Sequence, residues 1–205
     1  MPGTKVVAAA IVDGIGNSEE VAQFVGIAAE VAARVGARKT AVLGILAAAE
    51  LVAAPAAAEI EPDGVAVLAV AAPGEDTSLA WTGDSRAYGW DGQTLIQRST
   101  DHTVGQYLRY NRVAVELAKE HDNWIRVSLG RSSIASVHAC RISDPMVILT
   151  SDGVHDQLTH EELEDVVRIH ADGGLQAMAD AVVAAVSDRP SGSRDDATVA
   201  ILRIG

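Results

Sequence analysis

The segment Asp13-Gly14-Ile15-Gly16 directly follows an apolar run typical of a buried strand, and so does Ser151-Asp152-Gly153-Val154-His155-Asp156 far downstream. A strand that ends in Asp-Gly places a carboxylate at the edge of a sheet, and glycine lets the backbone carbonyl turn toward the same point. Such oxygens bind magnesium, manganese or calcium, whereas zinc and copper favour histidine and thiolate ligands. Each segment alone is more often a simple turn after a strand. Together they suggest an oxygen-lined cation site held by two separate strand ends.

Length and charge narrow the class of protein. The 205 residues suit one domain, 1–205, with a substantial core, and the many small apolar side chains favour helices packed closely on sheets. The formal charge of −12 argues against nucleic acid and against an anionic membrane as partners, because both require a basic surface. It agrees with carboxylates that divalent ions neutralise, although an ordinary acidic surface explains most of the charge.

The cysteine count and the N-terminal run indicate the compartment. Cys140 is the single cysteine, which excludes an intramolecular disulfide and agrees with a reducing compartment. The apolar run 6–12 stops at Asp13, well short of the ~18 residues of a membrane span, and no small-residue cleavage site follows it. We expect a cytoplasmic protein.

Hydrophobic periodicity predicts helices on either side of a central run of strands. The first helix spans 17–36 with Asn17 as its cap, a second follows over about 39–58, and two more run from Thr159 to Val186. The expected strands are 6–12, 64–71, 78–81, 87–90, 94–97, 133–140, 146–150 and 197–202. This order predicts an α+β fold, an α-β-β-α sandwich of two mainly antiparallel sheets with helices on the outside.

Five acidic motifs occur along the chain in an order that carries a resemblance. They are Asp13-Gly14-Ile15-Gly16, Gly83-Asp84-Ser85-Arg86-Ala87-Tyr88, Thr100-Asp101-His102-Thr103, Ser151-Asp152-Gly153-Val154-His155-Asp156 and Asp195-Asp196-Ala197-Thr198. In this order, over nearly the whole chain, the sequence resembles the metal-dependent serine/threonine protein phosphatases of type 2C, the PPM family. The resemblance implies the same sandwich, two Mn2+ or Mg2+ ions joined by a bridging water, and a mobile flap, here 103–126.

The resemblance also implies roles for individual residues. Asp13 would bridge the two ions, the carbonyl of Gly14 would bind the first, and Asp152 and Asp195 would bind the second. A third, more weakly bound ion would lie at an outer site formed by Asp101 and Asp156 together with Asp152. The substrate would be a protein carrying phosphoserine or phosphothreonine.

The implied chemistry needs no covalent nucleophile from the protein. Two divalent ions can lower the pKa of a bridging water and neutralise the phosphoryl oxygens that it attacks. Cys140 lies in an apolar strand pattern without the surroundings of an activated thiol. We expect Asp84 to support the site from behind, His102 and His155 to be structural or exposed, and Trp81, Trp90 and Trp124 to serve packing.

Departures from the family pattern leave two functions open. Relatives carry, before the first Asp-Gly strand, a phosphate-binding arginine and an Asn-Glu-Asp run, and no such segment precedes Asp13 in this sequence. Ile15 and Asn17 also replace residues usual in the family. The chain is either a shortened but active phosphatase or a catalytically weak pseudophosphatase that binds phosphoproteins or partner proteins. A nucleotide-binding protein is disfavoured, since no Gly-rich loop with a lysine follows a strand.

Arg194 offers a candidate for the missing phosphate clamp. It directly precedes the proposed ligand Asp195 in a Ser-Gly-Ser loop, and a planar guanidinium can grip two phosphoryl oxygens at once. The alternative is a solvated surface arginine that contributes little.

Overall fold

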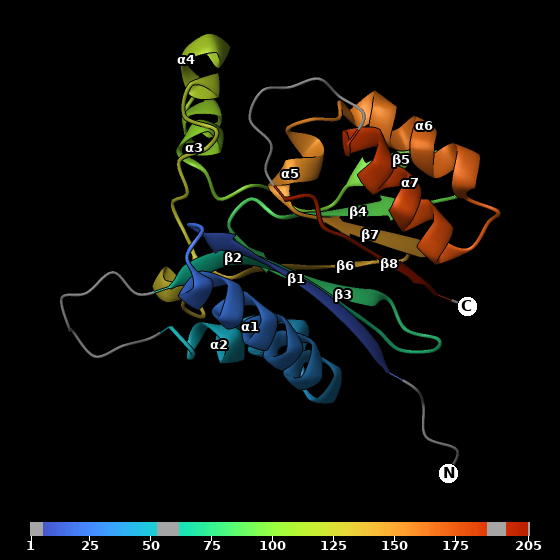
Figure 1. Ribbon diagram of the computed structural model, residues 1–205, viewed down its shortest axis with the longest axis horizontal. Helices are drawn as coiled ribbons and strands as arrows, with labels where there is room; N and C mark the ends of the chain where they lie inside the picture. The colour runs from blue at the N-terminus through green and yellow to red at the C-terminus, as the bar shows by residue number, and fades with distance from the viewer. Residues whose placement is uncertain (1–5, 53–61, 188–195, 205) are drawn as a thin grey trace.

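Four layers make up the structure. The computed structural model describes residues 6–52, 62–187 and 196–204. Figure 1 shows two helices below one sheet, a second sheet packed on the first, and two helices above the second sheet. The predicted α-β-β-α sandwich is therefore confirmed.

Both sheets have four strands, and every neighbouring pair is antiparallel. The first has the order β1-β2-β3-β6, formed by Val7–Ile15, Asp63–Ala71, Thr77–Thr82 and His138–Ile142. The second has the order β5-β4-β7-β8, formed by Leu95–Gln97, Arg86–Trp90, Met146–Thr150 and Val199–Arg203. The hairpins β2–β3 and β4–β5 confirm the two that the turn residues predict.

The first helical layer packs closely because its contact residues are small. It consists of α1 (Glu19–Arg38) and α2 (Ala41–Ala49), with Ala28 and Ala32 fully buried. A Cβ placed on Gly44 would lie 2.5 Å from the carbonyl oxygen of Ala32 in α1, so only glycine permits this approach of the two helices. The layer buries the outer face of the first sheet, and a separate apolar cluster fills the space between the sheets.

The second helical layer covers the other sheet. It consists of α6 (His160–His170) and α7 (Leu175–Ser187), and the short α5 (Asp152–His155) precedes it. The predicted capping box forms, since the Thr159 hydroxyl accepts from the backbone of Glu162 and the Glu162 carboxylate accepts from the backbone of Thr159. Leu163 and Val167 of α6 then pack with Val182 of α7 in the core above the second sheet.

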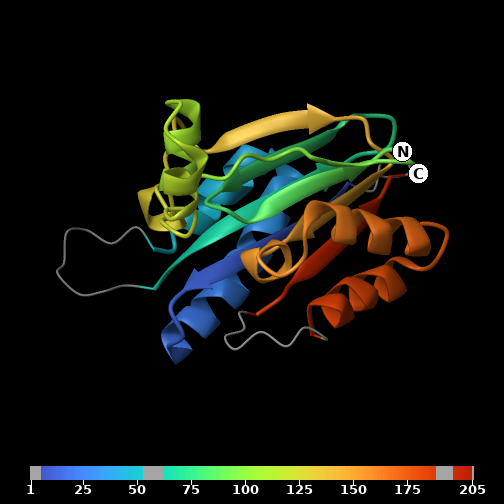
Figure 2. The same ribbon diagram turned by 90° about the horizontal axis from the view of Figure 1, so that it is seen from above.

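The predicted flap is a small helical unit beside one end of the sandwich. It contains α3 (Val104–Tyr110) and α4 (Val115–Lys119), and the 3-10 turn η1 (Leu129–Arg131) follows. Figures 1 and 2 show that α3 and α4 project away from the two sheets. A single β-bridge between Thr103 and Ile125 closes the base of the unit.

Four sequence expectations are wrong in detail. Ser18 rather than Asn17 caps α1, because its hydroxyl accepts from the backbone N–H of Val21. The strand expected from Ser133 begins only at His138, since residues 133–137 form a hydrogen-bonded turn. Trp124 is 57% exposed instead of packed. The expected second helix ends at Ala49 where 39–58 was predicted, and 53–58 lies outside the described residues.

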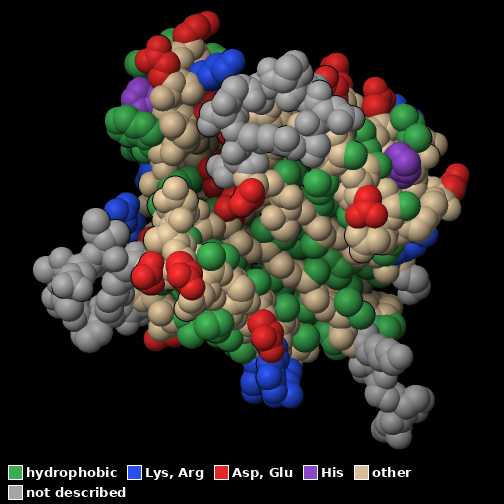
Figure 3. Space-filling model, in the orientation of Figure 1, with side chains coloured by type: hydrophobic (Ala, Val, Ile, Leu, Met, Phe, Trp, Pro, Cys, Tyr) green, Lys and Arg blue, Asp and Glu red, His purple; other side chains and the backbone are tan. Residues whose placement is uncertain are grey.

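Charged side chains are dispersed over the face of the molecule that Figure 3 shows. Figure 3 shows acidic side chains spread over both helical layers and over the outer end of the flap, and basic side chains that lie apart from one another on this face. Within the described ranges, no helix combines the length and the apolar character that crossing a membrane requires.

Candidate active site

A pocket of ≈ 1010 Å³ lies at the end of the sandwich beside the flap. One wall comes from the end of β1, the turn between β3 and β4, the segment after β5, and α5. The opposite wall comes from α3 and from the residues that follow α4. The pocket is thus shared by both sheets and by the flap.

Most of the site residues predicted from the sequence line this pocket. Five of them do so: Asp13, Gly14, Asp101, Asp152 and Asp156. Asp195 and Arg194 lie outside the described residues. Segments separated by more than a hundred positions therefore meet at one place, as the ends of the two Asp-Gly strands were expected to do.

Gly14 keeps the end of β1 close to the first helix. A Cβ at this position would lie 2.3 Å from the Cγ1 of Val21 and 3.0 Å from that of Val25, so a side chain has no room. Asp13 is paired with Val65 of β2, which fixes the backbone of β1 at the pocket wall. The glycine of this motif thus has a packing role, since it lets β1 and α1 approach closely.

Asp152 begins α5 directly after β7. Its Oδ1 is buried and has no hydrogen-bond partner among the described residues. Burying a carboxylate oxygen without a partner is costly, so this atom is suited to a ligand that supplies positive charge or a donor.

The pKa of Asp84 shows that negative charge is concentrated in the pocket. Asp84 is 8% exposed and lies in the turn before β4. Burial, together with repulsion from Asp152, Asp101 and Asp156, raises the pKa of its carboxyl to about 7. Asp152, Asp101 and Asp156 are thus close enough to oppose the ionisation of Asp84.

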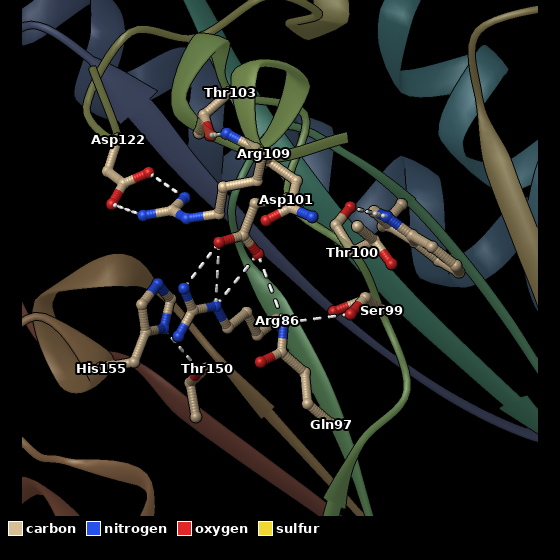
Figure 4. Close-up of polar contacts among 12 residues, drawn as sticks. Arg86, Gln97, Ser99, Thr100, Asp101, Thr103, Arg109, Asp122, Thr150 and His155 are labelled. Carbon is tan, nitrogen blue, oxygen red and sulfur yellow. Dashed lines mark hydrogen bonds and ion pairs between the residues drawn. The ribbon is translucent and has the colours of Figure 1, made fainter. Parts of the chain in front are cut away.

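Arg86 engages one of the predicted ligands directly. Its Nη2 donates to Oδ2 of Asp101 at 2.6 Å, and its Nε donates to Oδ1 at 3.0 Å. Burial opposes the charge of Arg86, but the hydrogen bonds and charge of Asp101 outweigh it and raise the pKa of Arg86. Asp101 is therefore already held by a cation from the protein, as Figure 4 shows.

A second arginine comes from the flap. Arg109 of α3 donates from Nη1 to Oδ1 of Asp122 at 2.5 Å and from Nη2 to Oδ2 at 2.6 Å. Both residues line the pocket. Sequence reasoning missed this pair, because two residues of opposite charge in a polar segment carry no sign that a helical turn will bring them together.

The two histidines beside the predicted ligands are neutral at pH 7. Burial and the charge of Arg86 lower the pKa of His155 to about 2, and its Nδ1 lies 3.2 Å from the Thr150 hydroxyl. Burial, His138 and Arg126 lower the pKa of His102 to about 4. The Nδ1 of His102 accepts from the backbone N–H of Gly83 at 3.3 Å. The alternative of an exposed imidazole is thus wrong for His102, whereas His155, which is half-buried, lines the pocket.

The donor set suits a hard divalent cation. The pocket offers oxygen ligands from the carboxyl groups of Asp13, Asp84 and Asp152, and the lining contains no thiolate. One of these oxygens, Oδ1 of Asp152, has no partner among the described residues. Within residues 6–52, 62–187 and 196–204, no three acidic, histidine or cysteine side chains are already grouped as a metal site. These residues fit the chemistry of magnesium or manganese but do not form a complete coordination shell by themselves.

Comparison with known proteins identifies the fold through structure rather than sequence. No protein-family model matches the chain, and a search of curated proteins finds no match. Solved structures do match it, over nearly its whole length.

Three of these structures illustrate the similarity. A bacterial serine phosphatase has a TM-score of 0.75 at 19% identity, over 99% of this chain and 91% of that one. The S. agalactiae serine/threonine phosphatase has a TM-score of 0.80 at 15% identity, over 98% and 89%. The PPM Ser-Thr phosphatase MsPP from Mycobacterium smegmatis has a TM-score of 0.67 at 18% identity, over 100% and 94%. At such identities the comparison establishes the fold.

Proposed function

We propose that this chain, which has the fold of the PPM-type serine/threonine phosphatases, hydrolyses phosphoserine and phosphothreonine in proteins with a metal-activated water. One observation carries the proposal. Asp13 at the end of β1 and Asp152 after β7 come from different sheets and line the same pocket, where repulsion from Asp152 contributes to the raised pKa of Asp84. A carboxylate pocket of this kind is suited to divalent ions and, through them, to a phosphate ester.

The proposed ligands keep the roles that the family resemblance implies. Asp13, the carbonyl of Gly14, Asp152 and Asp195 would hold two Mn2+ or Mg2+ ions. Bound there, the two ions would supply a water of lowered pKa and positive charge for the phosphoryl oxygens. The Oδ1 of Asp152 is buried, and charge interactions at a buried atom are screened less by water.

The proposal includes the outer metal site, where Arg86 already binds one of the proposed ligands. Asp101 and Asp156 would hold a third, weakly bound ion, but Asp101 makes a bidentate ion pair with Arg86. Binding an ion through Asp101 must loosen or share that pair, which favours weak binding. Arg194 remains our proposal for a phosphate-binding residue. The protein would act in the cytoplasm on phosphorylated proteins.

Hydrolysis of p-nitrophenyl phosphate and of a phosphothreonine peptide tests the proposal. We expect turnover by EDTA-treated protein after MnCl2 is added, and none before. Asp152→Asn should remove the activity, whereas Asp180→Asn, a neutralisation on the exposed surface of α7, should leave it unchanged. Turnover that is equally fast in EDTA, or that survives Asp152→Asn, contradicts the proposal. Absence of turnover with retained phosphopeptide binding would instead select the pseudophosphatase function.

A further inference from the structure

Arg109 is a cation that the flap places at the pocket. It lies in α3, opposite the carboxylates of the sandwich, and its side chain is 32% exposed. Figure 4 shows Asp101 between the side chains of Arg86 and Arg109. Hydrogen bonding to Asp122 raises the pKa of Arg109; Asp101 raises it further, and Arg86 lowers it. The guanidinium of Arg109 therefore interacts with charged side chains of the proposed active site as well as with Asp122 of the flap.

The pairing with Asp122 leaves part of this guanidinium available. A guanidinium has five N–H donors, and two of them bind the Asp122 carboxylate, one from each Nη. Among residues 6–52, 62–187 and 196–204, the Nε–H and the remaining N–H of each Nη have no hydrogen-bond partner. One edge of the group can therefore bind two oxygens of a phosphate, which is the arrangement that guanidinium geometry favours.

Close packing fixes where Asp122 holds the arginine. A Cβ on Gly105 would lie 2.1 Å from Oδ1 of Asp122 and 2.5 Å from the carbonyl oxygen of Ala118. The backbone N–H of Gly105 donates to the carbonyl of His121 at 2.9 Å, so α3 is bound to the segment that carries Asp122. Asp122 therefore acts as a rigid partner that orients Arg109.

We propose that Arg109 binds the phosphoryl group of the substrate from the flap side of the pocket, with Asp122 as the residue that positions it. The inference rests on the proposed function, since it assigns a substrate contact within the same pocket. The ligand class is a phosphate monoester on a peptide. Asp122 also lowers the affinity of Arg109 for phosphate, because its carboxylate competes with the phosphate for the same guanidinium.

The ion pair between Arg109 and Asp122 could serve only to fasten the flap, or Arg109 could also bind phosphate. Two substitutions distinguish these roles by their effect on the KM. If the pair only fastens the flap, Arg109→Ala and Asp122→Asn remove the same contact and change the kinetics in the same direction. If Arg109 binds phosphate, Arg109→Ala loses the ligand contact while Asp122→Asn frees it. We therefore expect Arg109→Ala to raise the KM of a phosphothreonine peptide about tenfold, and Asp122→Asn to lower it about two- to threefold.

Arg126→Ala is the matched control. Arg126 is also a flap arginine, but it stacks on the ring of Tyr107 at 4.3 Å and does not line the pocket. Its removal should leave the KM within about twofold. Arg109→Lys, which keeps the charge but loses the paired donors, should lie between the parent and Arg109→Ala. Circular dichroism of each variant verifies that the fold is kept.

Binding without turnover separates this inference from the proposed function. The same peptide, labelled and titrated by fluorescence anisotropy into metal-free protein, should bind about tenfold more weakly to Arg109→Ala. A parent that binds the peptide through Arg109 but hydrolyses nothing would refute the phosphatase and support the inference. An active parent whose KM and peptide affinity are unchanged in Arg109→Ala would overturn the inference, as would equal shifts in Arg109→Ala and Asp122→Asn.

Discussion

Asp84→Asn should stabilise the metal-free protein, and the gain should grow with pH. Asp84 has a pKa of about 7 in the folded protein, against the ordinary aspartate value of 3.8, so the folded state holds its proton more tightly than the unfolded state. Between pH 3.8 and about pH 7 the folded state binds one proton more than the unfolded state. The free energy of unfolding therefore falls by ~1.4 kcal/mol for each unit by which the pH rises. The loss is complete above the folded pKa and is absent below the unfolded one. It amounts to ~4 kcal/mol at most, since one pKa unit corresponds to ~1.36 kcal/mol.

Urea unfolding in EDTA measures this effect. Asparagine has the shape of the protonated carboxyl and cannot ionise, so the variant lacks the pH-dependent loss. The difference in unfolding free energy, variant minus parent, should increase by ~2.5 kcal/mol from pH 5 to pH 8. His102 and His155, whose pKa values are lowered, change stability in the opposite direction below pH 6.5, but they do so in both proteins. A difference that stays constant over this range would refute the electrostatic account of the pocket.

Three further substitutions test the packing around the site by urea unfolding. Gly44→Ala should cost ~1–3 kcal/mol, since the added Cβ would lie 2.5 Å from the carbonyl oxygen of Ala32, and an unchanged midpoint would contradict the close helix contact. Thr159→Ala should cost ~1 kcal/mol by removing the cap of α6, and Thr159→Ser should restore most of it. Arg98→Ala should cost ~3 kcal/mol, because it leaves the carboxylate of Asp144, 4% exposed, without its bidentate partner; a loss below ~1 kcal/mol would contradict this account.

The parts of the site that sequence predicts are those that local chain chemistry determines. An apolar run followed by Asp-Gly indicates a strand and the region where it ends, and for this reason Asp13 and Asp152 could be assigned near strand ends. The exact end is wrong for the first strand, because β1 continues through Asp13 and Gly14 to Ile15. The hairpin at Asp91-Gly92 follows from the same kind of local rule, since Asp91 accepts from the backbone of Gln93 and Thr94.

The parts that sequence does not predict depend on contacts between segments. The Arg109–Asp122 pair forms only because Gly105 lets α3 approach the chain after α4, which no periodicity encodes. His102 likewise accepts a hydrogen bond from the backbone N–H of Gly83, a residue from another segment. Local competition caused the error at the start of α1, where Asn17 and Ser18 are both good caps and the backbone selects Ser18.

The charges of the pocket are balanced unevenly, and this bears on where a cation would bind. Asp101 and Asp122 each have an arginine as a bidentate partner, so a divalent ion gains less by binding at either of them. Burial and the neighbouring carboxylates raise the pKa of Asp84 to about 7, so that it is only partly ionised near neutral pH, and Asp152 retains a buried oxygen without a partner in the described part of the chain. An ion beside Asp152 would satisfy that oxygen and relieve the repulsion that Asp84 experiences. Arg109 therefore supplies positive charge from the flap and Arg86 supplies it from β4, whereas the buried oxygen of Asp152 is left for positive charge from an ion.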